Sequence, residues 1–313
     1  MSITTIISGS LAYDRIMTFP DYFMNHILPE KLHVLNVSFI IDHVAEHFGG
    51  TAGNIAYSLK LMGGEPVITA TIGHDYRRYF DWMERQGIAT DGIKIIDSEF
   101  TAGAIITTDK ADNQITGFNP GAMKYSSQLD FERLDPARTL MIVSPGNLDD
   151  MRLYAATCKM RGIRYIFDPG QSLPALSGAD LLDAISGCAI LMVNDYEFEL
   201  IMNKTGLKKE AICERVQEAT IVTMGEHGSE VTQGGRLVKI GVAKAKAVVD
   251  PTGCGDSYRG AFLHALATGR GIVEAAAMGS VCASFTVEQH GTQNHRFTED
   301  EFLARLHQLT ASV

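Results

Sequence analysis

Short apolar runs and helical repeats of apolar residues alternate along much of this chain. The runs are rich in β-branched residues, which is typical of strands buried on both faces of a sheet. Between them, apolar residues recur at helical spacing, for instance over residues 151–161 and 299–309. Repeated strand–helix units predict an α/β fold with a doubly wound, mostly parallel sheet. Its strands are expected at residues 3–8, 66–72, 139–144, 164–168, 189–193 and 219–224.

Two parts of the chain interrupt this alternation. Residues 16–45 mix aromatic, proline and polar residues without a sustained period. Residues 102–108 and 114–118 flank a turn-rich stretch and predict a β-hairpin. We therefore expect a small β-sheet lid beside a large α/β domain. The lid should comprise residues 11–45 and 95–120, and the large domain residues 1–10, 46–94 and 121–313.

The stretch from Asp250 to Gly260 places glycines and an acid at the predicted start of a helix. Apolar residues at helical spacing follow Asp256. Gly253, Cys254 and Gly255 would then lie at the helix N-terminus, where unpaired amide N–H groups and the helix dipole favour an anion. A carboxylate at Asp256 could take a proton from an attacking hydroxyl, which suits phosphoryl transfer. The alternative is a glycine-rich turn in which Asp256 only caps the helix.

A second glycine-rich stretch, Gly49-Gly50-Thr51-Ala52-Gly53-Asn54, also leads into a predicted helix. Its glycines would let the backbone approach a ligand, and Asn54 offers both an amide donor and an acceptor. A purely structural turn fits the same residues. Asp14 lies just past the end of the first predicted strand, where open α/β sheets place ligand groups, although a solvated loop acid would look the same.

Two further strand ends carry candidate ligand groups. Asn194 and Glu197 directly follow a predicted strand and are three residues apart, so both could face one site. Such oxygen ligands suit Mg²⁺, which commonly keeps its waters, but an N-cap with a capping-box Glu fits equally well. The stretch 223–228 ends another strand with two glycines that could accommodate a nucleotide. The sequence lacks Gly-x-x-x-x-Gly-Lys-Ser/Thr, so a Walker-type kinase is not expected.

In this order, the segments resemble the ribokinase/PfkB family of carbohydrate and nucleoside kinases. Residues 49–54 resemble the first signature of the family, and residues 250–260 resemble the second. In the second, Asp, Pro, two spaced glycines and the catalytic Asp all fall into register. The resemblance covers nearly the whole chain and implies a ribokinase-like sheet with a small β lid.

The resemblance also implies roles for individual residues. Asp256 would act as the general base, and Gly253, Cys254 and Gly255 would complete the anion hole with it. Departures from the family pattern are Cys254, which stands where a small residue such as Ala is usual, and His295, which stands where a hydroxyl ligand to a monovalent cation is common. The implied sites are ATP at Asn194, Thr223, Gly225, Gly228 and Gly291; Mg²⁺ at Asn194 and Glu197, largely through water; substrate at Asp14, Gly49, Gly50, Asn54 and Asn113; and, for members that use a monovalent cation, K⁺ at Asp250 and Thr252.

Several segments resemble the adenosine and nucleoside kinase branch more than ribokinase itself, namely residues 9–14, 26–48 and 113–123. We therefore expect transfer of the γ-phosphate of ATP to the 5′-hydroxyl of an adenosine-, inosine- or guanosine-like nucleoside. A sugar kinase of the same fold is the alternative, and a binding protein without catalysis is a further one. Three side chains in these segments could either sandwich a base or form the core of the lid: Phe39, Phe118 and Met123.

Composition narrows the partners and the compartment. The chain has 27 basic and 37 acidic residues, for a net charge of −10, which argues against nucleic acid or an anionic membrane as the main partner. Its five cysteines are widely spaced, as expected for free thiols in a reducing compartment. With no signal peptide and no apolar run of membrane-spanning length, the cytoplasm is expected. An exposed lid edge would need covering, so either a monomer or a homodimer through the lid is expected.

Overall fold

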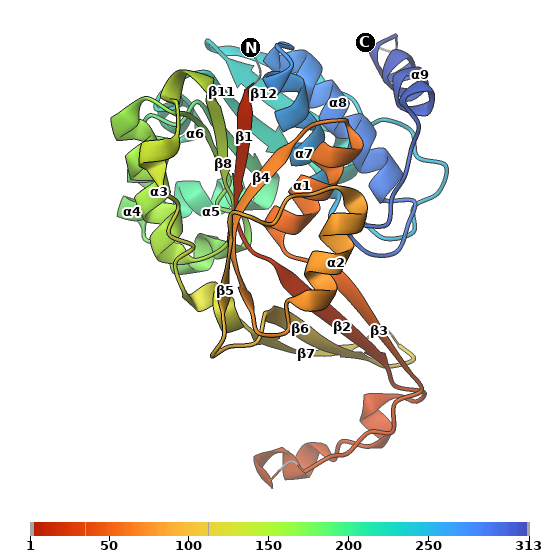
Figure 1. Ribbon diagram of the computed structural model, residues 1–313. Helices are drawn as coiled ribbons and strands as arrows, with labels where there is room; N and C mark the ends of the chain where they lie inside the picture. The colour runs from red at the N-terminus through yellow and green to blue at the C-terminus, as the bar shows by residue number, and fades with distance from the viewer. Residues whose placement is uncertain (1–2, 35, 112, 312–313) are drawn as a thin grey trace.

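The computed structural model describes residues 3–34, 36–111 and 113–311, and it contains a nine-stranded sheet and a separate four-stranded sheet (Figure 1). The strand pairs of the large sheet are parallel except for β11–β12 and β12–β13 at one edge, which confirms the predicted mostly parallel α/β sheet. In spatial order its strands are β13 (Arg236–Ile240), β12 (Ser229–Gln233), β11 (Ala219–Thr223), β10 (Ile190–Asn194), β9 (Arg164–Phe167), β8 (Thr139–Val143), β1 (Thr4–Ser8), β4 (Pro66–Gly73) and β5 (Ile93–Ile96).

Helices cover both faces of this sheet because its central strands, such as β8, bury side chains on both sides. The adjacent residues Ile6 and Ile7 of β1, for example, belong to different hydrophobic clusters, since side chains alternate across a strand. The cluster around Ile7 includes α1 (Thr51–Leu61), α2 (Arg77–Gln86), α7 (Cys254–Ala267), α8 (Ile272–Thr286) and α9 (Glu299–Thr310). The cluster around Ile6 includes α3 (Leu148–Arg161), α4 (Gly178–Ile185), α5 (Asp195–Thr205) and α6 (Lys209–Cys213).

The chain changes direction across the sheet at β1, which pairs with β4 on one side and β8 on the other. The loops that follow β1 and β8 meet closely there: a Cβ on Gly146 would lie 3.0 Å from the carbonyl carbon of Gly9. Pro145 O accepts hydrogen bonds from Ser10 N at 3.0 Å and Thr51 Oγ1 at 2.7 Å. Open α/β sheets bind ligands in the crevice at such a switch point, beyond the carboxyl ends of the strands.

The small sheet lies beyond these strand ends (Figure 1). Its β6–β7 hairpin is antiparallel as predicted, whereas β2 and β6 run parallel. Between β2 and β3 the chain extends well past the sheet in a segment that we call the arm, residues 19–34 and 36–42. In spatial order the strands are β3 (His43–Gly49), β2 (Ala12–Thr18), β6 (Ala102–Thr108) and β7 (Gln114–Asn119).

The division between lid and large domain falls later in the chain than expected at two places. β3 pairs with β2 as far as Gly49, so the small sheet continues beyond residue 45. β5 pairs with β4 as far as Ile96, so residues 95 and 96 lie in the large sheet. Strand pairing sets both limits, and no change of composition along the chain marks them.

Short 3₁₀ helices connect these elements, namely Phe23–Asn25, Pro29–Val34, Gly121–Lys124, Phe131–Arg133, Pro136–Arg138, Gly170–Ala175 and Gly225–His227.

None of the helices in the described ranges combines the length and the apolarity that crossing a lipid bilayer requires.

Candidate active site

The N-terminus of α7 is built on a glycine that no other residue could replace without strain. Gly253 is the N-cap, with φ of 81°, and a Cβ there would lie 2.9 Å from Cβ of Thr292. The helix itself begins at Cys254, so Asp256 lies inside its first turn. The interpretation of Asp256 as the helix cap is therefore wrong, because Gly253 occupies that position.

The Asp256 carboxylate is held by Asn54, which donates from Nδ2 to Oδ2 at 2.8 Å. Burial raises the pKa of the Asp256 carboxyl to about 6, although the positive charge of Arg259 and the hydrogen bond from Asn54 both oppose that rise. The negative charges of Asp168 and Glu197 add to it. A carboxylate with a pKa just below neutral is ionised at pH 7 and is still basic enough to accept a proton.

A cavity of about 210 Å³ opens beside this helix end. Its lining joins the N-terminal turn of α7 to the ends of β10 and β11, to the loops after β8 and β9, and to the first residue of α1. The fold thus gathers six residues that the sequence predicted for catalysis, nucleotide or metal: Asn194, Glu197, Thr223, Gly253, Gly255 and Asp256.

A buried ion pair in the same cavity was not predicted. Arg259 is 6% exposed and Asp168 only 1%, and Arg259 Nη2 donates to Asp168 Oδ1 at 2.7 Å. Arg259 Nε lies 2.6 Å from the other carboxylate oxygen, but without hydrogen-bond geometry. Arg259 Nη1 also donates to Gly255 O at 2.9 Å, one helical turn back. This pair ties the N-terminal turn of α7 to the end of β9 and places a cation beside the base.

Asn194 and Glu197 form a capping box at the start of α5, so the structural alternative for them is realised. Asn194 Oδ1 accepts from Glu197 N at 2.7 Å, and Glu197 Oε2 accepts from Asn194 N at 2.8 Å. The box uses one oxygen of each side chain, which leaves the second Glu197 oxygen and the Asn194 N–H groups for a ligand. Burial and the nearby Asp168 charge raise the pKa of Glu197, although the Asn194 N–H and the positive charge of Arg259 oppose the rise.

The two glycines after β11 have different surroundings, and only one of them is required by close contacts. Gly228 has φ of 85°, and a Cβ there would lie 2.1 Å from Ile240 O, so the fold itself demands glycine. Gly225 has φ of 54° with no atom within 4 Å of the Cβ position, so its surroundings are open. Thr223 ends β11 at the cavity wall. A ligand could therefore reach Thr223 and Gly225, whereas Gly228 shapes the turn.

The residues predicted to hold a monovalent cation also converge. Asp250 accepts from Thr252 N at 2.9 Å through Oδ1 and from Gly291 N at 3.0 Å through Oδ2. His295 is 0% exposed, its Nε2 lies 3.2 Å from Ser58 Oγ, and burial lowers its pKa to about 3. The ring is thus a neutral core side chain packed against α1, and it is not placed as a ligand beside the Asp250 loop.

Asp14 lies in β2 against the glycine that precedes the first helix. A Cβ on Gly49 would lie 2.5 Å from Asp14 Oδ2, and a Cβ on Gly50, whose φ is 87°, would lie 2.5 Å from Ser10 O. Burial raises the pKa of Asp14, although the Ala104 N–H and the neighbouring charge of His47 oppose the rise. The two glycines therefore clear space around an acid that is partly desolvated and can accept hydrogen bonds from a ligand.

Comparison with known proteins decides the family. The model of the pfkB family of carbohydrate kinases matches residues 15–299. This chain belongs to the PfkB family.

Relatives within the family include nucleoside kinases. The nucleoside kinase of Methanocaldococcus jannaschii is 34% identical over 289 residues, which is 91% of this chain and 93% of that protein. The structure of Burkholderia thailandensis nucleoside kinase with inosine has 36% identity and a TM-score of 0.85, covering 98% of each chain. Its complex with ADP-inosine has 37% identity and a TM-score of 0.83, covering 98% of this chain and 96% of that one.

One predicted substrate residue of this PfkB kinase lies away from the others. Asn113 donates from Nδ2 to both oxygens of Asp109, at 3.2 and 3.1 Å, in the β6–β7 turn. That turn is near the arm, because Asp109 also accepts from Phe23 N at 2.9 Å. Asp14 lies four residues back along β2 from Thr18, which pairs with the Thr108 end of β6. The structure therefore does not bring Asn113 to Asp14, since local turn formation holds its amide.

Two of the side chains expected to meet a base have other surroundings. Phe39 packs on Phe19 and Phe23, with ring centroids 4.7 and 5.2 Å apart, which realises the alternative that it belongs to the core of the lid. Phe118 is 57% exposed on β7. Met123 is half-buried after β7, and its carbonyl accepts from Asn147 Nδ2 at 3.1 Å.

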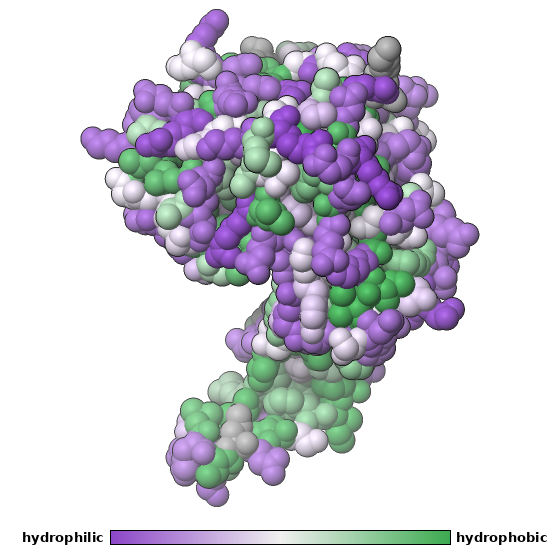
Figure 2. Space-filling view, turned by 60° about the vertical axis from the view of Figure 1, so that its left-hand side comes forward, coloured by the Kyte–Doolittle hydropathy of each residue, from purple (hydrophilic) through white to green (hydrophobic). Residues whose placement is uncertain are grey.

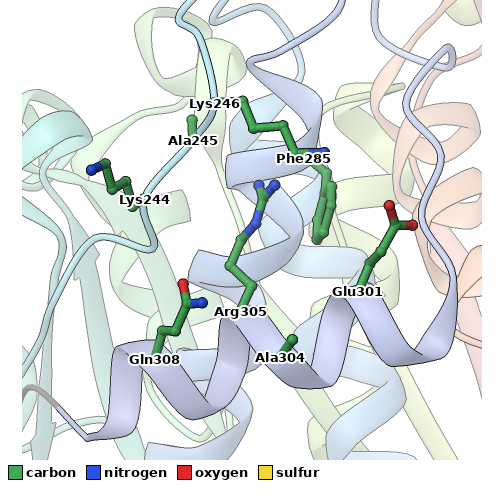
Figure 3. Close-up of a pocket in the computed structure, with 8 residues that line it drawn as sticks. All are labelled: Lys244, Ala245, Lys246, Phe285, Glu301, Ala304, Arg305 and Gln308. Atoms are coloured by element: carbon green, nitrogen blue, oxygen red, sulfur yellow. The ribbon is translucent and has the colours of Figure 1, made fainter.

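A second cavity, of about 340 Å³, lies between the loop after β13 and α9 (Figure 3). Lys244, Phe285 and Arg305 line it, and it contains none of the residues that the sequence predicted for function. Arg305 is already engaged with Glu288 at 3.0 Å and Ser284 Oγ at 2.8 Å. The residues that the sequence predicted for catalysis line the smaller cavity at α7 instead.

Proposed function

We propose that this PfkB kinase transfers the γ-phosphoryl group of ATP to the 5′-hydroxyl of a purine nucleoside. The observation that carries the proposal is the Asp256 carboxylate, with its pKa near 6, inside the first turn of α7 and beside the cavity. The similarity to nucleoside kinases over nearly the whole chain supports the substrate class.

Asp256 acts as the general base in this proposal. It accepts the proton of the attacking hydroxyl, while amide N–H groups and the dipole of α7 stabilise the charge that develops on the transferred phosphoryl group. Gly253 and Gly255 supply such amides. The Cys254 N–H donates to Pro251 O at 3.2 Å, so it would have to leave this turn to join the anion hole.

The Cys254 thiol is not the nucleophile in this proposal. Burial raises its pKa to about 12, so the thiol stays protonated at neutral pH, and Sγ donates to Ala283 O at 3.6 Å.

ATP and Mg²⁺ fit the residues present. Thr223 and Gly225 are proposed to receive the nucleotide together with Gly291, while Gly228 shapes the turn that presents them. Among the described residues there is no group of three or more His, Cys, Asp or Glu side chains able to hold a metal. Mg²⁺ would accordingly be held by water, phosphate oxygens and the free oxygen of Glu197, with Asn194 donating to a phosphate. The ion supplies charge neutralisation on the phosphates when it is bound.

On the acceptor side, we assign the ribose hydroxyls to Asp14, with Gly49, Gly50 and Asn54 shaping the site around them. K⁺ is proposed at Asp250 and Thr252, where a cation would have to displace the backbone amides that now donate to the carboxylate. Because all five cysteines are free in the structure, we also propose the cytoplasm as the compartment.

We propose, further, that two copies pair through the lid. Hydrophobic residues gather on the small sheet and the arm (Figure 2). Ile105, Ile115 and Phe118 are 48%, 48% and 57% exposed, and every residue of the edge strand β7 is exposed. An unprotected apolar edge strand favours pairing with another strand. Light scattering should give the dimer mass for the wild type and the monomer mass for Phe118→Lys; a monomeric wild type would overturn this part.

The experiment for the activity is product identification. The enzyme with ATP and Mg²⁺ is incubated with adenosine, inosine, guanosine and ribose, and the products are separated by mass spectrometry. ³¹P–¹H coupling then shows which carbon carries the phosphate. We expect nucleoside 5′-monophosphates, and phosphorylation of ribose alone would instead favour the sugar-kinase alternative.

A further inference from the structure

A chain of buried hydrogen bonds leads from α2 to the base. Trp82 Nε1 donates to Gln293 Oε1 at 2.8 Å, and Gln293 Nε2 donates to Asn54 Oδ1 at 3.0 Å. Asn54 Nδ2 in turn donates to Asp256 Oδ2 at 2.8 Å. Gln293 Nε2 also donates to Tyr79 OH at 2.8 Å, and Tyr79 OH donates to Gly49 O at 2.7 Å.

We propose that Gln293 and Trp82 are positioning residues for phosphoryl transfer, because they fix the amide of Asn54 with its N–H group toward Asp256. This inference rests on the proposed function. It assigns a role to Gln293 and Trp82, which lie outside both glycine-rich signatures.

The direction of the chain follows from its first member. An indole N–H can only donate, so the oxygen of Gln293 must face Trp82 and the nitrogen must face Asn54. Asn54 then has to present its oxygen to Gln293 and its nitrogen to Asp256. An amide can otherwise turn over with little change of shape, and a turned Asn54 would point an oxygen at the carboxylate. Trp82 therefore sets the polarity of a contact two residues away.

The protein makes room for this chain at a signature glycine. A Cβ on Gly53 would lie 2.1 Å from Tyr79 OH and 3.0 Å from Gln293 Nε2, so only glycine lets the side chains meet behind α1. Gln293 and Asn54 are 3% and 4% exposed, and Tyr79 is 0% exposed. Buried polar groups of this kind are costly unless paired, so the hydrogen bonds hold the side chains in a single arrangement.

The consequence falls on the ionisation of the base. A donor aimed at a carboxylate favours its charged form, and Asn54 is that donor. The charged groups near Asp256 are Arg259, which also favours the anion, and Asp168 and Glu197, which oppose it. If the amide of Asn54 turned over, the carboxylate would lose this donor while the charges of Asp168 and Glu197 still opposed ionisation. The pKa of Asp256 would then rise, and the carboxyl would stay protonated to a higher pH.

The experiment uses Gln293→Leu and Trp82→Phe in the full chain. Trp82→Phe removes the N–H donor and keeps an aromatic ring against Phe48. In the wild type the ring centroids of Trp82 and Phe48 are 5.3 Å apart. For Gln293→Leu we expect kcat to fall roughly ten- to hundred-fold, as for a buried polar group left unpaired. For Trp82→Phe we expect a smaller fall in kcat. In both variants the acid limb of the kcat profile should move to higher pH, with the KM for ATP unchanged.

A matched control deletes a buried hydrogen-bonding group elsewhere. Tyr154 is 1% exposed on α3, and its hydroxyl bonds Ser127 Oγ at 2.7 Å and Leu129 N at 3.0 Å. Tyr154→Phe should lower Tm without moving the pH profile. If Gln293→Leu and Trp82→Phe lower Tm in the same way and leave both kcat and its acid limb unchanged, the chain is only structural and the proposal is overturned.

A readout without turnover separates this inference from the proposed function. Trp82 is the single tryptophan of the chain, so its indole N–H gives one resolved NMR signal. We expect slow hydrogen exchange for that N–H in the wild type and fast exchange in Gln293→Leu. An infrared difference titration against Asp256→Asn should show a higher carboxyl pKa in Gln293→Leu. An unchanged pKa overturns the inference even if no substrate has been found.

Discussion

The neighbours of Asp256 set the pKa that its proposed role as a base requires. An isolated aspartate is too weak a base for efficient proton transfer at neutral pH, and burial brings its pKa to about 6 while Arg259 and Asn54 keep it ionised at pH 7. The residue thus depends on a balance between desolvation and positive charge, and changes on either side of that balance have predictable effects.

Asp256→Asn should lower kcat by about 10²–10⁴-fold, because it removes the base and keeps the shape. The stability change follows from the pKa. Since the folded state raises that pKa from 3.8 to about 6, the wild type loses stability as pH rises through this window. The Tm of the Asn variant should therefore equal or exceed that of the wild type at pH 7.5, with a smaller gap at pH 5. Steady-state kinetics and calorimetry check this, and turnover within a few-fold of wild type would contradict it.

Asp14→Ala should raise the KM for the nucleoside about ten- to hundred-fold, since one side of a desolvated polar contact is lost. The KM for ATP should stay within two-fold, because Asp14 lies in β2 of the small sheet and does not line the cavity at α7. Initial-rate kinetics with each substrate varied in turn measure both constants. An unchanged nucleoside KM would remove Asp14 from the site.

Arg259→Met should lower the free energy of unfolding by about 3–5 kcal/mol, because it leaves Asp168 buried without a counter-ion. The double variant Arg259→Met/Asp168→Leu should recover most of this loss. Arg152→Met is the control: its guanidinium pairs with Asp180 at 2.9 Å at an exposed site and should contribute less than about 1 kcal/mol. Urea denaturation measures all three, and a double variant as unstable as the single one would contradict the account.

Residues that act through local geometry were predictable from the sequence, and those that act through contacts distant along the chain were not. Gly253 and Asp256 could be found because a helix start has a local pattern. Gln293 meets Asn54 across 239 positions and Arg259 meets Asp168 across 91, so no local pattern marks either contact. Asn113 illustrates the converse, since a segment resemblance placed it at the substrate and a turn contact places it elsewhere.

At the scale of elements, the strands that are apolar on both faces were the predictable ones. β1, β8 and β10 lie in the middle of the sheet and read as apolar runs. The edge hairpin of β12 and β13 was missed because its strands alternate with exposed polar residues, although Gly234 and Gly235 mark its turn with positive φ. The short strand β5, at the opposite edge of the sheet, was missed as well. Edge strands are only half-buried, so their signal is weaker.

The lid should close over the acceptor. Asp14 belongs to β2 and pairs with Ala104 of β6, so the acceptor site lies on the small sheet itself. Closure would exclude water and so protect ATP from hydrolysis during transfer. Hydrogen exchange followed by mass spectrometry should show the lid strands β2, β3, β6 and β7 becoming protected when nucleoside is added. α3, on the far face of the large sheet, serves as the internal control and should not change. Equal exchange of the lid with and without nucleoside would contradict closure.

At the scale of the whole molecule, the switch point at β1 collects the chemistry from segments spread over the chain. The parallel strands bring the ends of β10 and β11 to α7. The sequence predicted the mostly parallel α/β sheet correctly, because strands and helices alternate steadily along the chain. The relation of lid to arm could not be predicted, since irregular segments carry no period.

The central claim is that this PfkB kinase uses Asp256 to phosphorylate nucleosides. The most direct measurement is kcat/KM for inosine, adenosine, guanosine, ribose and fructose 6-phosphate, with ATP and Mg²⁺ saturating, in the wild type and Asp256→Asn. The account predicts that at least one purine nucleoside exceeds both sugars by tenfold or more, and that the Asn variant loses about 10²–10⁴-fold on that nucleoside. A wild type that turns over ribose or fructose 6-phosphate and no nucleoside would contradict it.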